Sequence, residues 1–214
     1  MTNPLHSKYL SLTKTKWLLF IGGVLLGALA ILAVRFAVYQ PDRVHYHANF
    51  AVYINGQREA FKGPQYYEEI ATCSSTGGIA APQQRGHMHD NENGLVHVED
   101  HIVTWGQFFE NLGWYVGPNF IQTATGTTYA AADQAKLHIV LNGQDYTDLT
   151  PITNIVIKDQ DRLLVSFGNT DQATLNNELK TIPTSARHAD VTPDPASCSG
   201  AASVTVSERL RHLF

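Results

Sequence analysis

The sequence of 214 residues is poor in cysteine, with only 2, and in charged residues, which make up 16%. So few cysteines exclude a disulfide-dense scaffold, and 16 glycines with 9 prolines exclude a collagen-like chain. Apolar residues make up 43%, which with so little charge excludes a disordered chain. Because 15 Lys plus Arg face 19 Asp plus Glu, the basic face of a nucleic-acid-binding protein is not expected. Gly-x-Ser-x-Gly, Walker, His-Glu-x-x-His and Cys-x-x-Cys motifs are also missing from the sequence.

One long apolar run lies near the N-terminus. Residues Trp17–Val34 are 18 consecutive apolar or glycine residues. As a helix they span about 27 Å, close to the ~30 Å hydrocarbon core of a bilayer. Residues up to Tyr39 extend the run, so the sequence predicts a single transmembrane anchor over 17–39 that contacts the lipid bilayer.

The charges around this run predict its orientation. Three lysines precede it and the first 39 residues contain no acid, so residues 1–16 are expected in the cytoplasm. The protein is therefore predicted to be a single-pass protein of the cell membrane, with everything after the anchor outside. A cleaved signal peptide, cut near Ala28-Leu29-Ala30, is the alternative interpretation.

The exterior part differs from the anchor in charge. From Gln40 onward, 11 Lys plus Arg remain against 19 acids, a charge of −8, which suits small cations better than nucleic acid. Its two cysteines, Cys73 and Cys198, would lie in an oxidising compartment, where one disulfide is the simplest expectation. A metal-ligand role for Cys73 is the competing interpretation.

The pattern after the anchor predicts a β-rich α+β domain over 40–182. Strands are expected at 44–54, 137–141, 154–158 and 162–168, and Asn-Gly turns follow the first two. Because FAVYINGQ at 50–57 resembles LHIVLNGQ at 137–144, we interpret these strand–turn units as a duplication, with convergence as the alternative.

Two helices and a tail complete the expected domain. A capping box at Thr104 and Gln107 predicts a short helix that starts at Trp105, and a second helix is expected at 171–182. Residues 183–214 are expected to be an extended C-terminal tail, tied back by Cys198.

Histidines are concentrated in one stretch of the chain. Of 10 histidines, six occur between His45 and His101. They form three clusters, which are His45-Tyr46-His47, His87-Met88-His89 and His97-Val98-Glu99-Asp100-His101. Residues i and i+2 of a strand lie on the same face, so each cluster directs two or more donor groups to one side.

The turn-rich residues 90–94 predict a hairpin between the second and third clusters. A five-residue loop places His87 opposite His97 and puts both on one face with His89 and Glu99. The residues between them, Met88, Val96 and Val98, then point into the core. A two-residue Asn93-Gly94 turn would mix the polar and apolar faces, so the longer loop is preferred.

These imidazoles predict a transition-metal site, with copper or zinc as the expected ion. Neutral imidazole is a common ligand of both metals, and acids nearby can orient the ring N–H groups that do not bind the ion. The expected ligands are His45, His47, His87, His89, His97, Glu99 and His101, with Asp90 and Asp100 as orienting acids. A metal-free hydrogen-bonded polar core and a pH-sensing cluster are the alternatives.

Several motifs of the exterior part resemble a family of uncharacterised membrane-anchored bacterial and archaeal proteins. They are HYHANFAVYING, HMHDNENGLVHVED, TWGQFFENLGW, DQDRLLVSFG and DPASCSG. The resemblance covers most of the exterior domain and implies no activity, but it favours the Cys73–Cys198 disulfide.

The function expected from the sequence is extracytoplasmic metal binding, for acquisition or delivery of the ion, with no protein partner indicated. Two alternatives remain: a hydrolase or hydratase that uses a three-histidine ion, and a cell-surface interaction module with a structural metal.

Overall fold

The computed structural model describes residues 4–40, 44–67, 85–89, 91–146, 152–192 and 204–213, with side chains from Lys16 onward. The chain divides into two compact units. The first contains Met1–Asp42 and Ala202–Phe214, and the second contains Arg43–Ala201.

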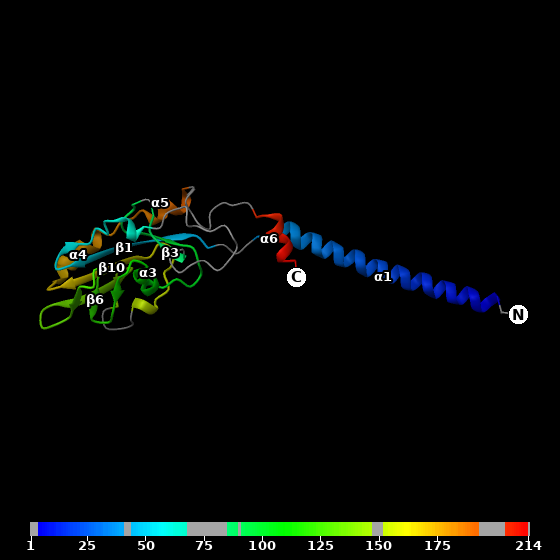
Figure 1. Ribbon diagram of the computed structural model, residues 1–214, viewed down its shortest axis with the longest axis horizontal. Coiled ribbons are helices and arrows are strands. Elements are labelled where there is room, and N and C mark those ends of the chain that lie inside the picture. Colours follow the sequence, from blue (N-terminus) through cyan, green and yellow to red (C-terminus); the bar gives the residue numbers. More distant parts are fainter. Residues whose placement is uncertain are drawn as a thin grey trace. The chain divides into compact units, whose positions relative to one another are not determined.

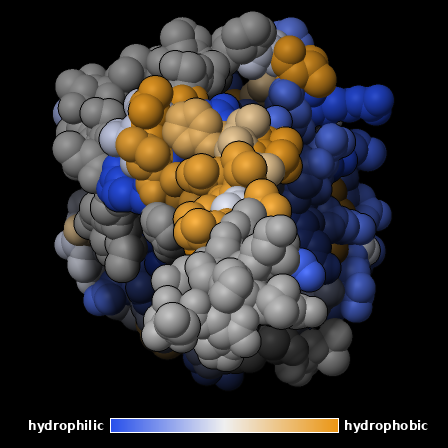
Figure 2. Space-filling model, turned by 90° about the vertical axis from the view of Figure 1, so that its right-hand side faces the viewer, coloured by the Kyte–Doolittle hydropathy of each residue, from blue (hydrophilic) through white to orange (hydrophobic). Residues whose placement is uncertain are grey.

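The first unit contains helix α1 (Pro4–Val38) and the short helix α6 (Val206–Arg211). The part of α1 at Lys16–Val38 is long and apolar enough to cross a membrane, a property it shares with signal sequences. Its large apolar side chains are exposed and form the orange patch facing the viewer in Figure 2. The predicted apolar helix is confirmed, whereas the cytoplasmic placement of residues 1–16 stays a prediction.

The second unit is a strand-rich α+β domain, as predicted. Its main sheet has the strand order β3-β4-β1-β10-β8-β9, with β2 paired to β1, and only the β1–β10 pair is parallel. The strands of this sheet are β1 (Tyr46–Ile54), β2 (Gln57–Arg58), β3 (Gly86–His87), β4 (Leu95–Val98), β8 (Lys136–Leu141), β9 (Gln144–Asp145) and β10 (Arg162–Gly168).

Smaller elements lie around the main sheet. A three-stranded antiparallel sheet is formed by β5 (Tyr115–Val116), β6 (Phe120–Gln122) and β7 (Thr128–Ala130). Among the residues that the structure describes, this unit has the helices α3 (Trp105–Asn111), α4 (Gln172–Lys180) and α5 (Ala186–Val191) and the 3-10 turns η1 (Pro64–Tyr66) and η3 (Ile152–Asn154). Figure 1 shows α4 and α5 on one face of the main sheet, and α3 with the small sheet on the other.

The alternation of β1 separates two cores. Ala48, Phe50 and Val52 point into the larger core, where Phe50 meets Phe108 and Phe109 of α3. Ala51 and Tyr53 point to the opposite face and pack in a smaller core with Leu175 of α4. Because His47 is also odd-numbered, it belongs to the face that α4 and α5 cover.

Most predicted local signals are present in the structure. Thr104 and Gln107 form the capping box of α3, and Asp171 caps α4 through Thr174 N at 2.8 Å. Both Asn-Gly turns have positive φ at the two turn residues, 51° and 75° at Asn55-Gly56 and 53° and 81° at Asn142-Gly143. This is the backbone of a two-residue hairpin turn. The shared turn accounts for the similarity between residues 50–57 and 137–144, and the structure does not show a duplicated unit.

Two expectations differ from the structure. The strand expected at 154–158 is replaced by η3 and one isolated bridge of Val156 to Thr104. The segment expected as an extended tail contains α5, whose Ala186 is 3% exposed, and α6. Short helices without a clear amphipathic pattern depend on tertiary contacts, which composition alone does not reveal. Cys73 and Cys198 lie outside the described residues, so their pairing stays a prediction.

Candidate metal-binding site

Three histidines form a row across neighbouring strands of the main sheet. His87 of β3 pairs with His97 of β4, and His97 pairs with His47 of β1. The His87–His97 pairing is the register that the five-residue loop predicts. Directly opposed residues have Cβ atoms about 4.5–5.5 Å apart, so backbone pairing alone brings the three imidazoles together on one face. Met88, Val96 and Val98 are fully buried in the core on the other face, as predicted.

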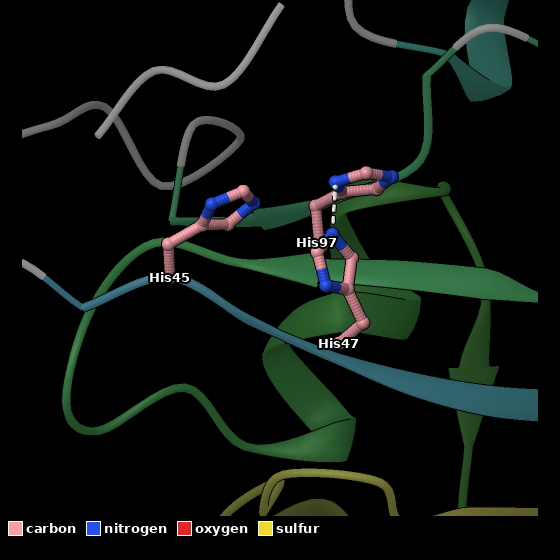
Figure 3. Close-up of side chains that lie close together, drawn as sticks. All are labelled: His45, His47 and His97. Carbon is pink, nitrogen blue, oxygen red and sulfur yellow. Dashed lines mark hydrogen bonds between the residues drawn. The ribbon is translucent and has the colours of Figure 1, made fainter. Parts of the chain in front are cut away.

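The tightest group in the part of the chain that the structure describes contains His45, His47 and His97. One nitrogen of each ring lies within 4.8 Å of the others, which is close enough to hold a metal ion. Figure 3 shows the rings of His47 and His97 directed at each other from adjacent strands, with His45 beside them. His47 and His97 are 1% and 3% exposed, whereas the His45 side chain is 24% exposed. The group therefore has two buried members and one that reaches solvent.

Asp190 of α5 fixes the orientation of His47. Its Oδ1 atom lies 2.7 Å from His47 Nδ1 and accepts a second bond, of 3.1 Å, from the His47 backbone N–H. Because an ionised carboxylate only accepts hydrogen bonds, His47 Nδ1 carries the proton. In neutral His47 the lone pair is therefore on Nε2, which lies 2.9 Å from His97 Nδ1. A carboxylate behind an imidazole is the usual support of a metal-binding histidine.

The electrostatics of the site keep His97 neutral. Burial lowers the pKa of His97 well below its usual range, and the neighbouring imidazoles of His89, His47, His87 and His45 lower this pKa further. A neutral imidazole is the form that binds a metal ion, so no proton has to be removed from a charged ring at physiological pH.

The observed spacing fits an ion after a small adjustment. Two nitrogens bound to tetrahedral zinc at ~2.0–2.1 Å are separated by about 3.3 Å. The His47–His97 separation of 2.9 Å is that of a hydrogen bond, and His97 must give up the Nδ1 proton in order to bind through this atom. Binding through both atoms therefore needs rotation of the rings and a shift of the His97 tautomer.

His87 and His89 continue the cluster on the far side of His97. Their ring centroids lie 5.8 Å and 3.6 Å from that of His97, and each residue is 4% exposed. They do not belong to the three-residue group, but all five imidazoles are contiguous. Glu99 approaches the other end, with Oε1 3.6 Å from His45 Nε2.

Two of the residues predicted for the site lie elsewhere. Strand β4 ends at Val98, so the alternation that would place His101 beside His97 does not continue, and His101 is exposed in a turn. Asp100 binds Arg85 at 2.7 Å and accepts from His101 N at 2.6 Å. A guanidinium group is a stronger partner for this carboxylate than a neutral ring N–H. Asp90 lies outside the described residues.

No protein-family model, curated protein or solved structure matches the chain. The resemblance to a membrane-anchored family therefore stays a prediction, and the chemistry of the site is argued from its geometry alone.

The residue that sequence reasoning missed is Asp190, because it is 143 positions from His47. Its position depends on Asn49, the next residue of β1 on the same buried face as His47. The Asn49 side chain donates to Gly94 O and to Ser185 Oγ, both at 3.1 Å, and accepts from Ala186 N at 3.0 Å. Asn49 thus holds the start of α5 against the His-bearing strands. A buried Asn two residues after His-x-His was the only local signal of this contact.

Proposed function

We propose that the protein is a membrane-anchored, extracytoplasmic binding protein for a transition metal, with copper or zinc as its ion. The single observation that carries the proposal is the group of His45, His47 and His97, whose nitrogens lie within 4.8 Å of one another. Imidazole donors select copper and zinc over the hard cations magnesium and calcium, which prefer oxygen ligands.

The burial of the group supports metal binding over a metal-free polar core. Burial lowers the pKa of His97, and a neutral buried imidazole can bind an ion without first losing the proton of a charged ring. An ion would replace the His47–His97 hydrogen bond of 2.9 Å and bind one nitrogen of each of the three rings, which already lie within 4.8 Å of one another. The partial exposure of His45 gives the ion a route in and out, which fits acquisition or delivery better than a purely structural ion.

The decisive experiment is metal titration of the full-length protein in detergent, followed by elemental analysis. A His47→Ala/His97→Ala double variant removes two proposed ligands. Its metal affinity should therefore fall by more than the ~10–100-fold that is typical when only a residue that orients a ligand is lost. His101→Ala is the matched control, because this exposed histidine lies in the same segment but outside the group. Circular dichroism checks that both variants fold. Wild-type affinity in the double variant, or loss in the control alone, would contradict the proposal.

A metal-dependent hydrolase or hydratase is the second candidate. Three protein ligands leave a fourth position for water, whose pKa zinc lowers to about 7, and Glu99 beside His45 is placed to act as a general base. Turnover of ester or carbon dioxide substrates by the zinc-loaded protein, lost in Glu99→Gln with the metal retained, would favour catalysis over transport.

A further inference from the structure

The C-terminal end of helix α1 has polar partners far away in the chain. Arg209 of α6 donates from Nη1 to the carbonyl oxygens of Phe36, at 2.5 Å, and Ala37, at 3.0 Å. The last carbonyls of any helix lack intrahelical partners and carry its negative dipole end. Arg209 therefore supplies both a donor and a positive charge at the place where α1 needs them.

Two further contacts join α6 to the same turn. The His212 ring stacks on Tyr39 with centroids 4.9 Å apart and an interplanar angle of 13°. Arg35 Nη2 lies 3.4 Å from His212 O, and the Arg209 guanidinium lies 5.7 Å from the centre of the Phe36 ring. α6 lies beside the end of α1, as Figure 1 shows.

The side chains of α6 are unusual for a helix exposed to water. Val206 and Leu210, four positions apart on one face, are 64% and 52% exposed. α6 contains two arginines, Arg209 and Arg211, against one acid, Glu208, and Arg209 donates to the carbonyl of the residue that follows Arg35. A helix of six residues is not stable alone in water, so α6 needs a surface that accepts both exposed apolar groups and positive charge.

We propose that α6 is a second membrane contact, an interfacial helix that binds anionic phospholipid headgroups where α1 leaves the bilayer. This inference rests on the anchoring part of the proposed function, and it does not depend on the metal site. If Lys16–Val38 spans the bilayer, the carbonyls of Phe36 and Ala37 lie at its surface, and Arg209 holds α6 at the same depth. Val206 and Leu210 would then insert beneath the headgroups while Arg35 and Arg211 meet their phosphates.

The contact also bears on whether α1 is retained. The residues that Arg209 and His212 contact all lie between Arg35 and Tyr39, at the C-terminal end of the apolar helix. A signal peptide cut near Ala30 would separate these residues from the membrane. The proposal therefore requires an anchor that stays in the mature protein.

Amide hydrogen exchange of the full-length protein in lipid vesicles tests this inference. The measured quantity is the exchange rate of the peptide covering 204–214, in vesicles of phosphatidylcholine alone and of phosphatidylcholine with phosphatidylglycerol. We expect exchange to be at least several-fold slower in the anionic vesicles. Arg211→Gln should reduce this difference, and Arg209→Gln should accelerate exchange in both vesicles. Arg187→Gln, at an exposed arginine of α5, is the control and should change neither rate.

The possible failures are distinguishable. If carbonate extraction removes the protein from the vesicles, the anchor itself is absent, and the proposed anchoring fails together with this inference. If the protein stays in the membrane but α6 exchanges equally fast in both vesicles, the lipid contact is overturned while the anchor stands. If only Arg209→Gln changes the rate, α6 binds α1 without recognising lipid, which also overturns the proposal. None of these outcomes affects the metal titration.

Discussion

Asp190 contacts His47 at the Nδ1 atom and at the backbone N–H, so it controls both the tautomer and the position of this ring. An Asp190→Asn variant can keep one acceptor oxygen for the His47 N–H groups but loses the negative charge beside the ring. We expect the affinity for copper or zinc to fall by about 10–100-fold, with the fold retained. Competition with a colorimetric chelator measures this change.

The matched control for Asp190→Asn is Asp133→Asn. Asp133 is exposed in a turn with φ of 27°, a conformation that asparagine also adopts readily. Its replacement removes the same charge at a distance from the cluster and should leave metal affinity unchanged. Equal losses in the two variants would mean that net charge, and not the orientation of His47, governs binding.

Much of the candidate site could be predicted at the level of single residues. His-x-His spacing gave the common face, and the division between polar and apolar residues gave the His87–His97 register. His101 was misplaced because alternation applies only inside a strand, and β4 ends three residues earlier. Asp190 could not be predicted, since no local pattern links it to His47 across the length of the domain.

At the level of elements, α4 places a carboxyl group against the main sheet. Glu178 is 4% exposed, and both of its carboxylate oxygens are buried. Burial raises the pKa of Glu178, and the nearby Ser166 hydroxyl and His138 offset that shift only in part. The folded protein therefore holds this proton more tightly than the unfolded chain does.

A Glu178→Gln variant tests whether burying the ionised Glu178 carboxylate destabilises the folded protein. A raised folded pKa gives stability that is present below the unfolded pKa, about 4.3, and lost as the pH rises through the folded value. At pH 7 we expect Glu178→Gln to increase the free energy of unfolding by on the order of 1 kcal/mol, and at pH 4 to change it little. Urea unfolding followed by near-UV circular dichroism measures both values. Glu110→Gln, at an exposed glutamate of α3, should have no such pH dependence.

Elements with strong local signals were predicted, and elements defined by tertiary contacts were not. The capping box of α3, the Asn-Gly turns and the strand β10 each have a sequence pattern that specifies the structure locally. The parallel β1–β10 pairing and the packing of α5 depend on residues more than a hundred positions apart. For the same reason the segment 154–158 is not a regular strand: it follows η3, pairs with residues 103–105 through one isolated bridge, and buries Ile157 in the larger core.

At the scale of the whole molecule, the histidine cluster makes the stability of the second unit depend on pH. The folded protein keeps His97 neutral because its pKa is lowered, first by burial. The unfolded chain takes up a proton at His97 below a pH of about 6.5. It then binds more protons than the folded state, so stability falls as the pH drops below that value, by up to about 1.4 kcal/mol per pH unit for each such group.

Metal binding should oppose this loss and depend on pH in the same direction. An ion present at a hundred times its dissociation constant stabilises the folded state by about 2.7 kcal/mol, but protons compete for the imidazoles in acid. We therefore expect zinc or copper to raise the melting temperature of the full-length protein strongly at pH 7.5 and weakly at pH 5.5. Differential scanning calorimetry with the ion and with a chelator measures the four values. In the His47→Ala/His97→Ala variant the ion should have no effect at either pH. An equal rise at both pH values, or a rise that survives in this variant, would show that the ion binds somewhere other than the histidine row.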